Sequence, residues 1–209
     1  MAETPDDSFL LILLKDVGTA IARRQCDDTQ ASRRDMIRTA FAAIEGLVWI
    51  FREEVIDTAE STYGLEDDEK LILQERQLSV TEQGKITEQQ RYLPLPTIIR
   101  FVARIAGRLN NVDHFEFGTA EWDGFRKAIG IRNRITHPKS ADDLHISKAD
   151  VDHVLDALYW FLEKHTEVSA QSVETRKRYL GQFKDVLEKL KTGDPEMTAL
   201  YDAVRDREA

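Results

Sequence analysis

The sequence is poor in cysteine and in long apolar runs, and both shortages limit where the protein can work. Cys26 is the single cysteine among 209 residues, so no disulfide can form within the chain. Such a chain fits a reducing compartment, and we expect a cytoplasmic protein. The apolar run Phe9–Leu14 is too short to span a bilayer and lacks the flanks of a signal peptide, so no membrane anchor is expected. We expect this run to be buried in a helix that continues to about Arg24.

The sequence also lacks the short motifs of several large enzyme classes. It contains no glycine-rich phosphate loop of the GxxxxGK[ST] or GxGxxG type and no nucleophile elbow, so kinase, Rossmann and hydrolase signatures are missing. Two groups of side chains combine residue types that bind metals. They are Asp142, Asp143 and His145, and Asp150, His153 and Asp156. Neither has the spacing of a known metal site, so we expect capping or solvated roles and neither a metal nor another cofactor.

Acidic residues outnumber basic ones, which argues against a general nucleic-acid coat protein. The formal net charge is −9 at pH 7, and 42 % hydrophobic with 32 % charged residues is typical of one globular domain. The basic residues are concentrated, because residues 100–139 contain eight Lys or Arg against four Asp or Glu. A basic segment on an acidic body suits a site that admits RNA locally. Equally, Arg100, Arg104 and Arg108 fit the solvated stripe of an amphipathic helix.

Apolar residues at alternating steps of three and four predict amphipathic helices. The clearest pattern predicts a helix over about residues 30–60, and a second predicts one over 96–110. The apolar seam of the first consists of Ile37, Phe41, Ile44, Val48, Phe51 and Val55. The inward residues of the second are Ile98, Ile99, Val102, Ile105 and Leu109. Thr119 is the predicted N-cap of a third helix, whose core face carries Trp122, Phe125 and Ile129. Ser147 and Asp150 resemble the capping box of a fourth.

The remaining segments predict a hairpin and a helical extension. Residues 78–93 form an insert whose strands meet at a turn around Gln83-Gly84. Two further helices are predicted over about 170–191 and 194–206, the second with Pro195 at its start. Leu180, Phe183, Leu187 and Leu190 give the first of them an apolar seam, which can dock on the core or extend a dimer surface. We therefore predict an all-α, up-and-down helical bundle over residues 1–167, with a small β-hairpin insert and a C-terminal helical extension over 168–209.

Most of the chemistry in the sequence lies where the third helix ends. Pro138 disfavours helical geometry at the residue before it, so this helix should stop at His137. Asn133 and His137 are four residues apart and share one face while the helix lasts. Arg132 lies about 140° away around the axis, but its long side chain can swing toward the same region. An arginine holds phosphate and a histidine exchanges a proton near neutral pH, so the three residues can bind a phosphate group and move a proton beside it.

An arginine followed by a histidine after a few residues is a weak signal alone. Arg108 and His114 have a similar spacing, but only Arg132 is followed directly by the asparagine and then, four residues later, by the histidine. This Arg-Asn-x-x-x-His motif, at the end of an amphipathic helix, resembles the signature of HEPN domains, small all-α domains of many ribonucleases in bacterial conflict systems. The resemblance covers about residues 30–167. It implies metal-independent cleavage of single-stranded RNA by a homodimer whose two motifs meet across a two-fold axis, in a toxin or phage-defence setting.

The resemblance also implies a role for each motif residue. Arg132 would stabilise the phosphate, His137 would be general acid or base, and Asn133 would orient one of them. Attack by the ribose 2′-hydroxyl would leave a 2′,3′-cyclic phosphate. A glutamate of the helix over 30–60, Glu45, could orient the arginine, although a plain surface carboxylate is the more frequent role. The basic residues expected to contact RNA beside the motif are Arg126, Lys127, Arg134 and Lys139.

Simpler roles for the motif remain open. Arg132 and Arg134 can pair with surface acids, Asn133 can bond the turn, and His137 can cap the helix. The domain would then bind RNA or a nucleotide without cutting it, or serve as a helical interaction module, such as a toxin half silenced by an antitoxin or another defence-system partner. Some relatives carry a tyrosine two residues after the histidine, which a partner enzyme modifies. Lys139 occupies that position here, which argues against this mode of silencing.

Overall fold

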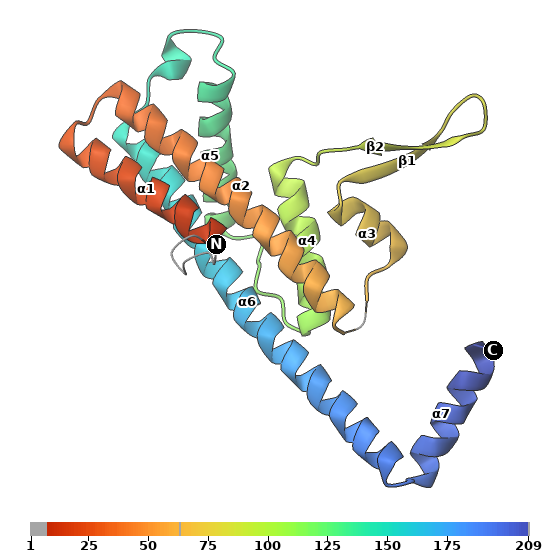
Figure 1. Cartoon of the computed structure of the whole chain (residues 1–209). Helices are drawn as coiled ribbons and strands as arrows, with labels where there is room; N and C mark the ends of the chain where they lie inside the picture. Colours follow the sequence, from red (N-terminus) through yellow and green to blue (C-terminus); the bar gives the residue numbers. More distant parts are fainter. Residues whose placement is uncertain (1–7, 63, 209) are drawn as a thin grey trace, which may run out of the picture.

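The computed structural model describes residues 8–62 and 64–208, and in these residues it contains seven α-helices and one β-hairpin (Figure 1). The helices are α1 (Phe9–Cys26), α2 (Gln30–Glu60), α3 (Asp67–Leu73), α4 (Leu95–Asn110), α5 (Ala120–Thr136), α6 (Lys148–Lys191) and α7 (Pro195–Glu208). The strands are β1 (Arg76–Val80) and β2 (Ile86–Gln90), and a 3-10 turn, η1 (Asp142–Leu144), precedes α6. The predicted all-α bundle with a small hairpin insert is confirmed.

Helix α2 is the central element of the bundle, since α1, α4, α5 and α6 all pack against it. Its predicted bounds are confirmed, and so is the burial of its whole predicted seam. A reciprocal capping box fixes its start: the Thr29 hydroxyl accepts from the Ser32 backbone N–H at 3.2 Å, and the Ser32 hydroxyl accepts from that of Thr29 at 2.9 Å. The predicted inward face of α4 is also buried, so α2 and α4 meet through apolar side chains.

Helix α1 is less buried than its apolar start predicts. Phe9, Leu11 and Ile12 are exposed, whereas Val17 and Ala20 further along the helix are buried. The expectation that the run over 9–14 is buried was therefore wrong in part. Its apolar residues surround the helix, while α2 covers only one side of α1. Within the described residues, no helix is both long and apolar enough to cross a membrane.

Helix α5 has the predicted start and end. The Thr119 side chain accepts from the Trp122 backbone N–H at 3.4 Å, and Trp122 and Phe125 are buried against α6 while Ile129 is partly buried. His137 is the C-cap residue, with φ −126° and ψ 59°, and the chain leaves the helix at Pro138 as expected. The motif therefore lies on the last two turns of α5 and on the residue that ends it.

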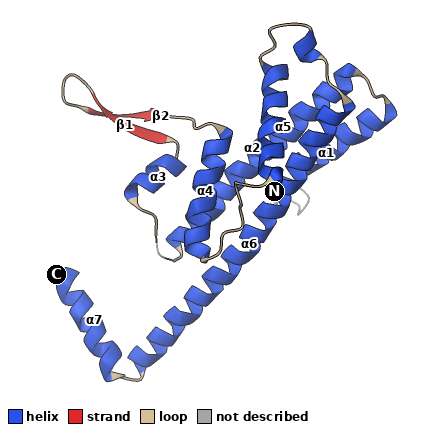
Figure 2. Ribbon diagram, turned by 180° about the vertical axis from the view of Figure 1, so that it is seen from behind, coloured by secondary structure: helices blue, strands red, loops and turns tan. Residues whose placement is uncertain are grey.

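Helix α6 is one continuous helix of 44 residues, so the predicted break between helices near residue 168 was wrong. No glycine or proline interrupts the sequence there, and the helix remains packed across that point: Val168, Ser172 and Thr175 are buried. The predicted division between residues 167 and 168 thus falls within one helix. Beyond Thr175 the helix leaves the bundle, and α7 turns back from its end to form an open V (Figure 2).

The hairpin and α3 form a separate projection on the other side of α4 (Figure 1). The strands pair antiparallel, with Val80 opposite Ile86 next to the turn and Arg76 opposite Gln90 at the other end. Gly84 lies in the turn with φ +73°, a conformation that glycine adopts without strain. The predicted hairpin is confirmed, and its first strand begins two residues before the predicted insert.

Candidate functional site

Arg132 is held in one orientation by residues of two helices. One guanidinium nitrogen donates to Asn133 Oδ1 at 3.1 Å, and the other donates to the carboxylate of Glu45 on α2. The guanidinium carbon also lies 5.8 Å from the centre of the Phe41 ring, within the range of a cation–π contact. The side chain of Arg132 remains 30 % exposed and that of Glu45 47 %. The arginine is therefore oriented by three neighbours and remains partly exposed to solvent.

Glu45 has the less frequent of the two roles that the sequence allowed. We expected a plain surface carboxylate first, yet the structure places Glu45 against Arg132. The pairing follows from spacing, because Phe41 and Glu45 are one turn apart on α2 and both face the guanidinium. In the sequence, the indication of this ion pair is a carboxylate one turn from a phenylalanine of the apolar seam. The sequence does not indicate which arginine the carboxylate pairs with.

His137 lies apart from the group around Arg132. Its backbone N–H donates to the Asn133 carbonyl at 2.9 Å, so it caps the helix through its main chain. The imidazole is exposed and has no hydrogen bond or ion pair with any residue that the structure describes. It comes five positions after Arg132, which corresponds to about 7.5 Å along the helix axis. The structure thus brings Arg132, Asn133 and Glu45 together, and places the histidine apart from them at the helix end.

Three of the four basic residues expected to contact RNA have partners of their own. Arg134 pairs with Asp150 at 3.2 Å, Lys127 contacts His153 Nε2 at 2.7 Å, and Arg126 lies 4.0 Å from Asp123. None of these contacts involves Glu45 or Asn133. The fourth, Lys139, is exposed on the loop after the motif, and its backbone N–H donates to Asp143 at 2.8 Å. These residues surround α5 and do not converge on Arg132.

The arginines of α4 are engaged within the molecule. Arg108 forms an ion pair with Glu69 of α3, and Arg104 lies 3.9 Å from the same carboxylate. The guanidinium of Arg100 lies over the rings of Phe117 and Trp122, at 5.4 and 5.1 Å from their centres. These contacts join α4 to α3 and to the start of α5. They explain the basic stripe as part of the packing, although Arg104 and Arg108 keep much of their surface exposed.

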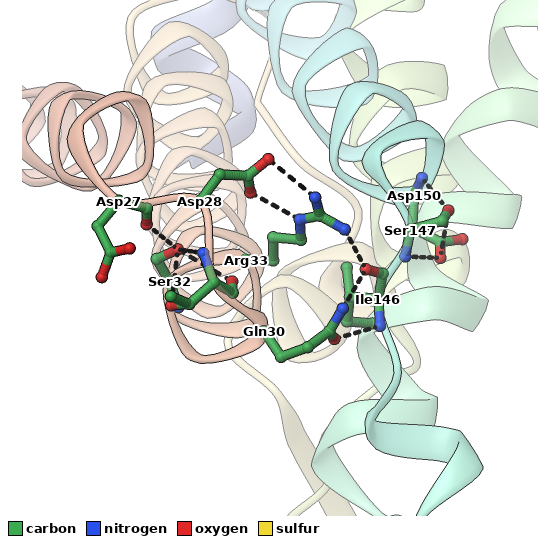
Figure 3. Close-up of polar contacts among 9 residues, drawn as sticks. Asp27, Asp28, Gln30, Ser32, Arg33, Ile146, Ser147 and Asp150 are labelled. Atoms are coloured by element: carbon green, nitrogen blue, oxygen red, sulfur yellow. Dashed lines mark hydrogen bonds and ion pairs between the residues drawn. The ribbon is translucent and has the colours of Figure 1, made fainter.

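The loop that follows the motif is held by the first turns of α2 (Figure 3). The Gln30 side chain makes two hydrogen bonds with the Ile146 backbone, donating at 3.0 Å and accepting at 2.8 Å. Arg33 donates to the same carbonyl at 2.9 Å while its other nitrogens bind Asp28. Arg38 reaches the Ile135 carbonyl at 3.5 Å. Together these contacts fix both ends of the segment that carries His137.

Asp143 and Asp150, for which we expected capping or solvated roles, both accept hydrogen bonds from backbone N–H groups, and only Asp150 caps a helix. Asp143 accepts from the backbone N–H groups of Lys139 and Ser140, and these bonds, the one from Lys139 first, lower the pKa of its carboxyl. Asp150 completes the capping box of α6 with Ser147. Burial acts to raise the pKa of Asp150, but the hydrogen bonds from Ser147 and the charge of Arg134 outweigh it, so the pKa is lowered. Among the described residues no group of three potential ligands is arranged to hold a metal ion.

This arrangement can bind a phosphate and exchange a proton near it. A guanidinium fixed by a carboxylate and an amide presents its free edge to an anion with little loss of side-chain freedom. Comparisons with protein-family models, curated proteins and solved structures find no match for this chain. The functional interpretation therefore depends on the motif and on the geometry around it.

Proposed function

We propose that the chain is a metal-independent endoribonuclease of the HEPN type, which cuts single-stranded RNA. The observation that carries the proposal is the orientation of Arg132 by Glu45 and Asn133, one and a half turns from an exposed histidine whose side chain has no partner among residues 8–62 and 64–208. A purely structural ion pair does not need an adjacent asparagine or an unpaired imidazole. The resemblance of the Arg-Asn-x-x-x-His motif to HEPN domains gives this geometry its chemical interpretation.

In the proposed reaction, the 2′-hydroxyl oxygen of one nucleotide attacks the phosphorus that follows it. The bond from phosphorus to the 5′-oxygen of the next nucleotide breaks, which leaves a 2′,3′-cyclic phosphate and a 5′-hydroxyl. One proton leaves the attacking hydroxyl and another reaches the departing oxygen, and His137 transfers one of them. Arg132 stabilises the negative charge that develops on the non-bridging phosphate oxygens. No step requires a metal ion.

We further propose that two copies of the chain act together, as the resemblance implies. One histidine can serve as base or as acid, so a second motif across a two-fold axis would supply the other proton transfer. A toxin or defence setting, with an antitoxin or another partner that controls the enzyme, belongs to the same proposal.

The proposal is tested by RNA cleavage in EDTA with matched variants. Arg132→Ala and His137→Ala should each lower the rate by about 100-fold or more. Two controls remove the same residue types elsewhere on the surface: Arg178→Ala on α6 and His145→Ala on the loop should cut like wild type. Cleavage that survives in both motif variants would contradict the proposal. If EDTA abolishes cutting by wild type, the reaction requires a metal ion and the proposed metal-independent mechanism is wrong.

A further inference from the structure

A pocket of about 450 Å³ lies beside the candidate site and shares Arg132 with it. Its floor is formed by α2, through Glu45, Val48, Trp49 and Arg52. Residues 92–95 and the first turn of α4 form another side. The volume lies within the range of about 300–1,000 Å³ that is usual for small-ligand sites. The motif arginine thus belongs both to the Glu45 pair and to the wall of a pocket that can hold part of a ligand.

Two aromatic side chains in this pocket are exposed to solvent. Trp49 is 51 % exposed and Tyr92 is 72 % exposed. The Trp49 and Phe9 rings form a T-shaped pair, with 5.8 Å between ring centres and an interplanar angle of 89°, and this contact leaves about half of the Trp49 surface exposed. Trp122, by contrast, lies in the core. Exposed aromatic surface in a pocket marks a place where a flat, unsaturated ligand can stack.

Of the two arginines that line the pocket, Arg132 is the one placed to bind an anion. Arg52 donates to the Leu73 carbonyl and lies 3.4 Å from Glu75, and both arginine and glutamate are largely buried. Arg52 therefore supports one end of the pocket. Glu45 holds Arg132 on the other side, one turn of α2 from Trp49. A phosphate at Arg132 would then lie next to the exposed indole.

The direction of the helices places this pocket on the side of Arg132 opposite to His137. Arg38 of α2 contacts Ile135, whereas Glu45 contacts Arg132, so α2 and α5 run antiparallel here. Along α2, the pocket residues continue from Glu45 to Arg52, away from Arg38. His137 lies beyond Ile135, in the opposite direction. An RNA strand with a phosphate at Arg132 would then have the histidine on one side of that phosphate and the pocket on the other.

We infer that this pocket binds one base of the RNA strand, stacked on Trp49 and Tyr92, next to the phosphate at Arg132. The choice of RNA as ligand rests on the proposed function. Stacking on aromatic side chains tolerates any base, because every base has a flat π-face. The pocket therefore positions the strand for cutting without dictating its sequence.

The test is the affinity of wild type and variants for a short, fluorescently labelled 2′-O-methyl oligonucleotide, which no 2′-hydroxyl attack can cut. Trp49→Ala and Tyr92→Ala should each weaken binding by about 5- to 100-fold. Trp49→Phe should keep most of the affinity, because a smaller ring still stacks. Tyr159→Ala removes a tyrosine of α6 that is 54 % exposed, and it should bind like wild type.

An oligonucleotide series with one base removed at successive positions identifies the stacked base. At one position the missing base should weaken binding to wild type but not to Trp49→Ala, because the two changes remove the same contact. If the loss of affinity from the missing base multiplies with the loss from Trp49→Ala at every position, the two changes are independent and no base occupies the pocket. The same conclusion follows if the aromatic variants bind like wild type. If Arg132→Ala loses binding but the Trp49 and Tyr92 variants do not, the site binds a phosphate but no base, and the inference is overturned.

The inference and the proposed function fail in different ways. Selective loss of binding in the aromatic variants of a protein that never cuts RNA would support the base subsite and contradict the ribonuclease. Cutting that depends on His137 but not on Trp49 or Tyr92 would support the ribonuclease and contradict the subsite. A folded wild-type protein that does not bind the oligonucleotide would overturn the subsite.

Discussion

The two halves of α6 have the same backbone but different surroundings. In the first half Val151, Val154 and Phe161 are buried, and the Phe161 ring lies between 5.9 and 6.5 Å from those of Phe51, Phe115 and Phe125. In the second half Leu180 is 63 % exposed and Phe183 is 55 % exposed. Both halves have apolar residues at helical spacing. Periodicity therefore predicts that a helix forms, and it does not say what covers the apolar face.

The comparison separates the part of the molecule that positions the site from the part that does not. The first half of α6 packs against α2 and α5, the two helices that hold Glu45 and Arg132. The part of α6 beyond Thr175 and α7 extend away from them (Figures 1 and 2). Most helical stability in proteins comes from tertiary packing, so the two halves should respond differently to equivalent changes.

The largest difference is expected for the two phenylalanines. Phe161→Ala should lower the free energy of unfolding by about 3–5 kcal/mol, because it leaves a cavity in the core. Phe183→Ala should change it by less than about 0.5 kcal/mol. Denaturant unfolding followed by circular dichroism measures both. An equally large effect of Phe183→Ala would mean that another surface covers the second half in solution.

The helix caps provide a smaller contrast. Ser147 caps α6, its hydroxyl accepting from the Asp150 N–H at 3.0 Å, and Asp194 caps α7, accepting from the Met197 N–H at 3.0 Å. Ser147→Ala should lower the stability of the bundle by about 0.5–2 kcal/mol. Asp194→Ala removes the same kind of hydrogen bond from α7, which makes few contacts with the bundle. The melting temperature of the bundle should therefore stay within error of wild type. A matching loss in both variants would show that α7 and the bundle unfold together.

The smallest effect is the contribution of Asp150 to acid stability. Hydrogen bonds and Arg134 lower its pKa in the folded protein against the opposing effect of burial, so the ionised carboxylate favours folding above the unfolded pKa. This contribution, about 1 kcal/mol or less, is lost as the pH falls through the lower, folded pKa. Asp150→Asn should therefore reduce stability near pH 7 and flatten its decline below about pH 4.

The control for that measurement is Asp185→Asn on the exposed half of α6. It should leave the acid branch of the stability curve unchanged, since Asp185 is exposed and follows Thr175, the last buried residue of α6. An Asp150→Asn protein with the same slope as wild type below pH 4 would show that other carboxyl groups dominate there.

Local features of the fold could be predicted from the sequence, and long-range contacts could not. The bounds of α2, the Thr119 and Ser147 caps and the stop at Pro138 follow from residues within one or two turns. The bonds between Gln30 and Ile146 join residues 116 apart, and no local pattern indicates them. The predicted break in α6 failed because polar residues there face partners such as Glu54, which accepts from Ser169 at 2.6 Å.

The candidate site shows the same division. The motif and the helix end that carries it were predicted from adjacent residues, whereas the partner of Arg132 depended on how α2 and α5 pack. The pocket beside it requires Trp49, Tyr92 and Arg132, which come from three separate segments. Spacing within one segment cannot reveal such a pocket.

The chemical nature of the RNA ends tests the central claim most directly. Purified protein is incubated with single-stranded RNA in EDTA, beside the Arg132→Ala and His137→Ala variants, and the products are analysed by mass. The account predicts 2′,3′-cyclic phosphate and 5′-hydroxyl ends from wild type, and intact RNA from both variants. Products with 3′-hydroxyl and 5′-phosphate ends, or intact RNA after incubation with a folded wild-type protein, would contradict it.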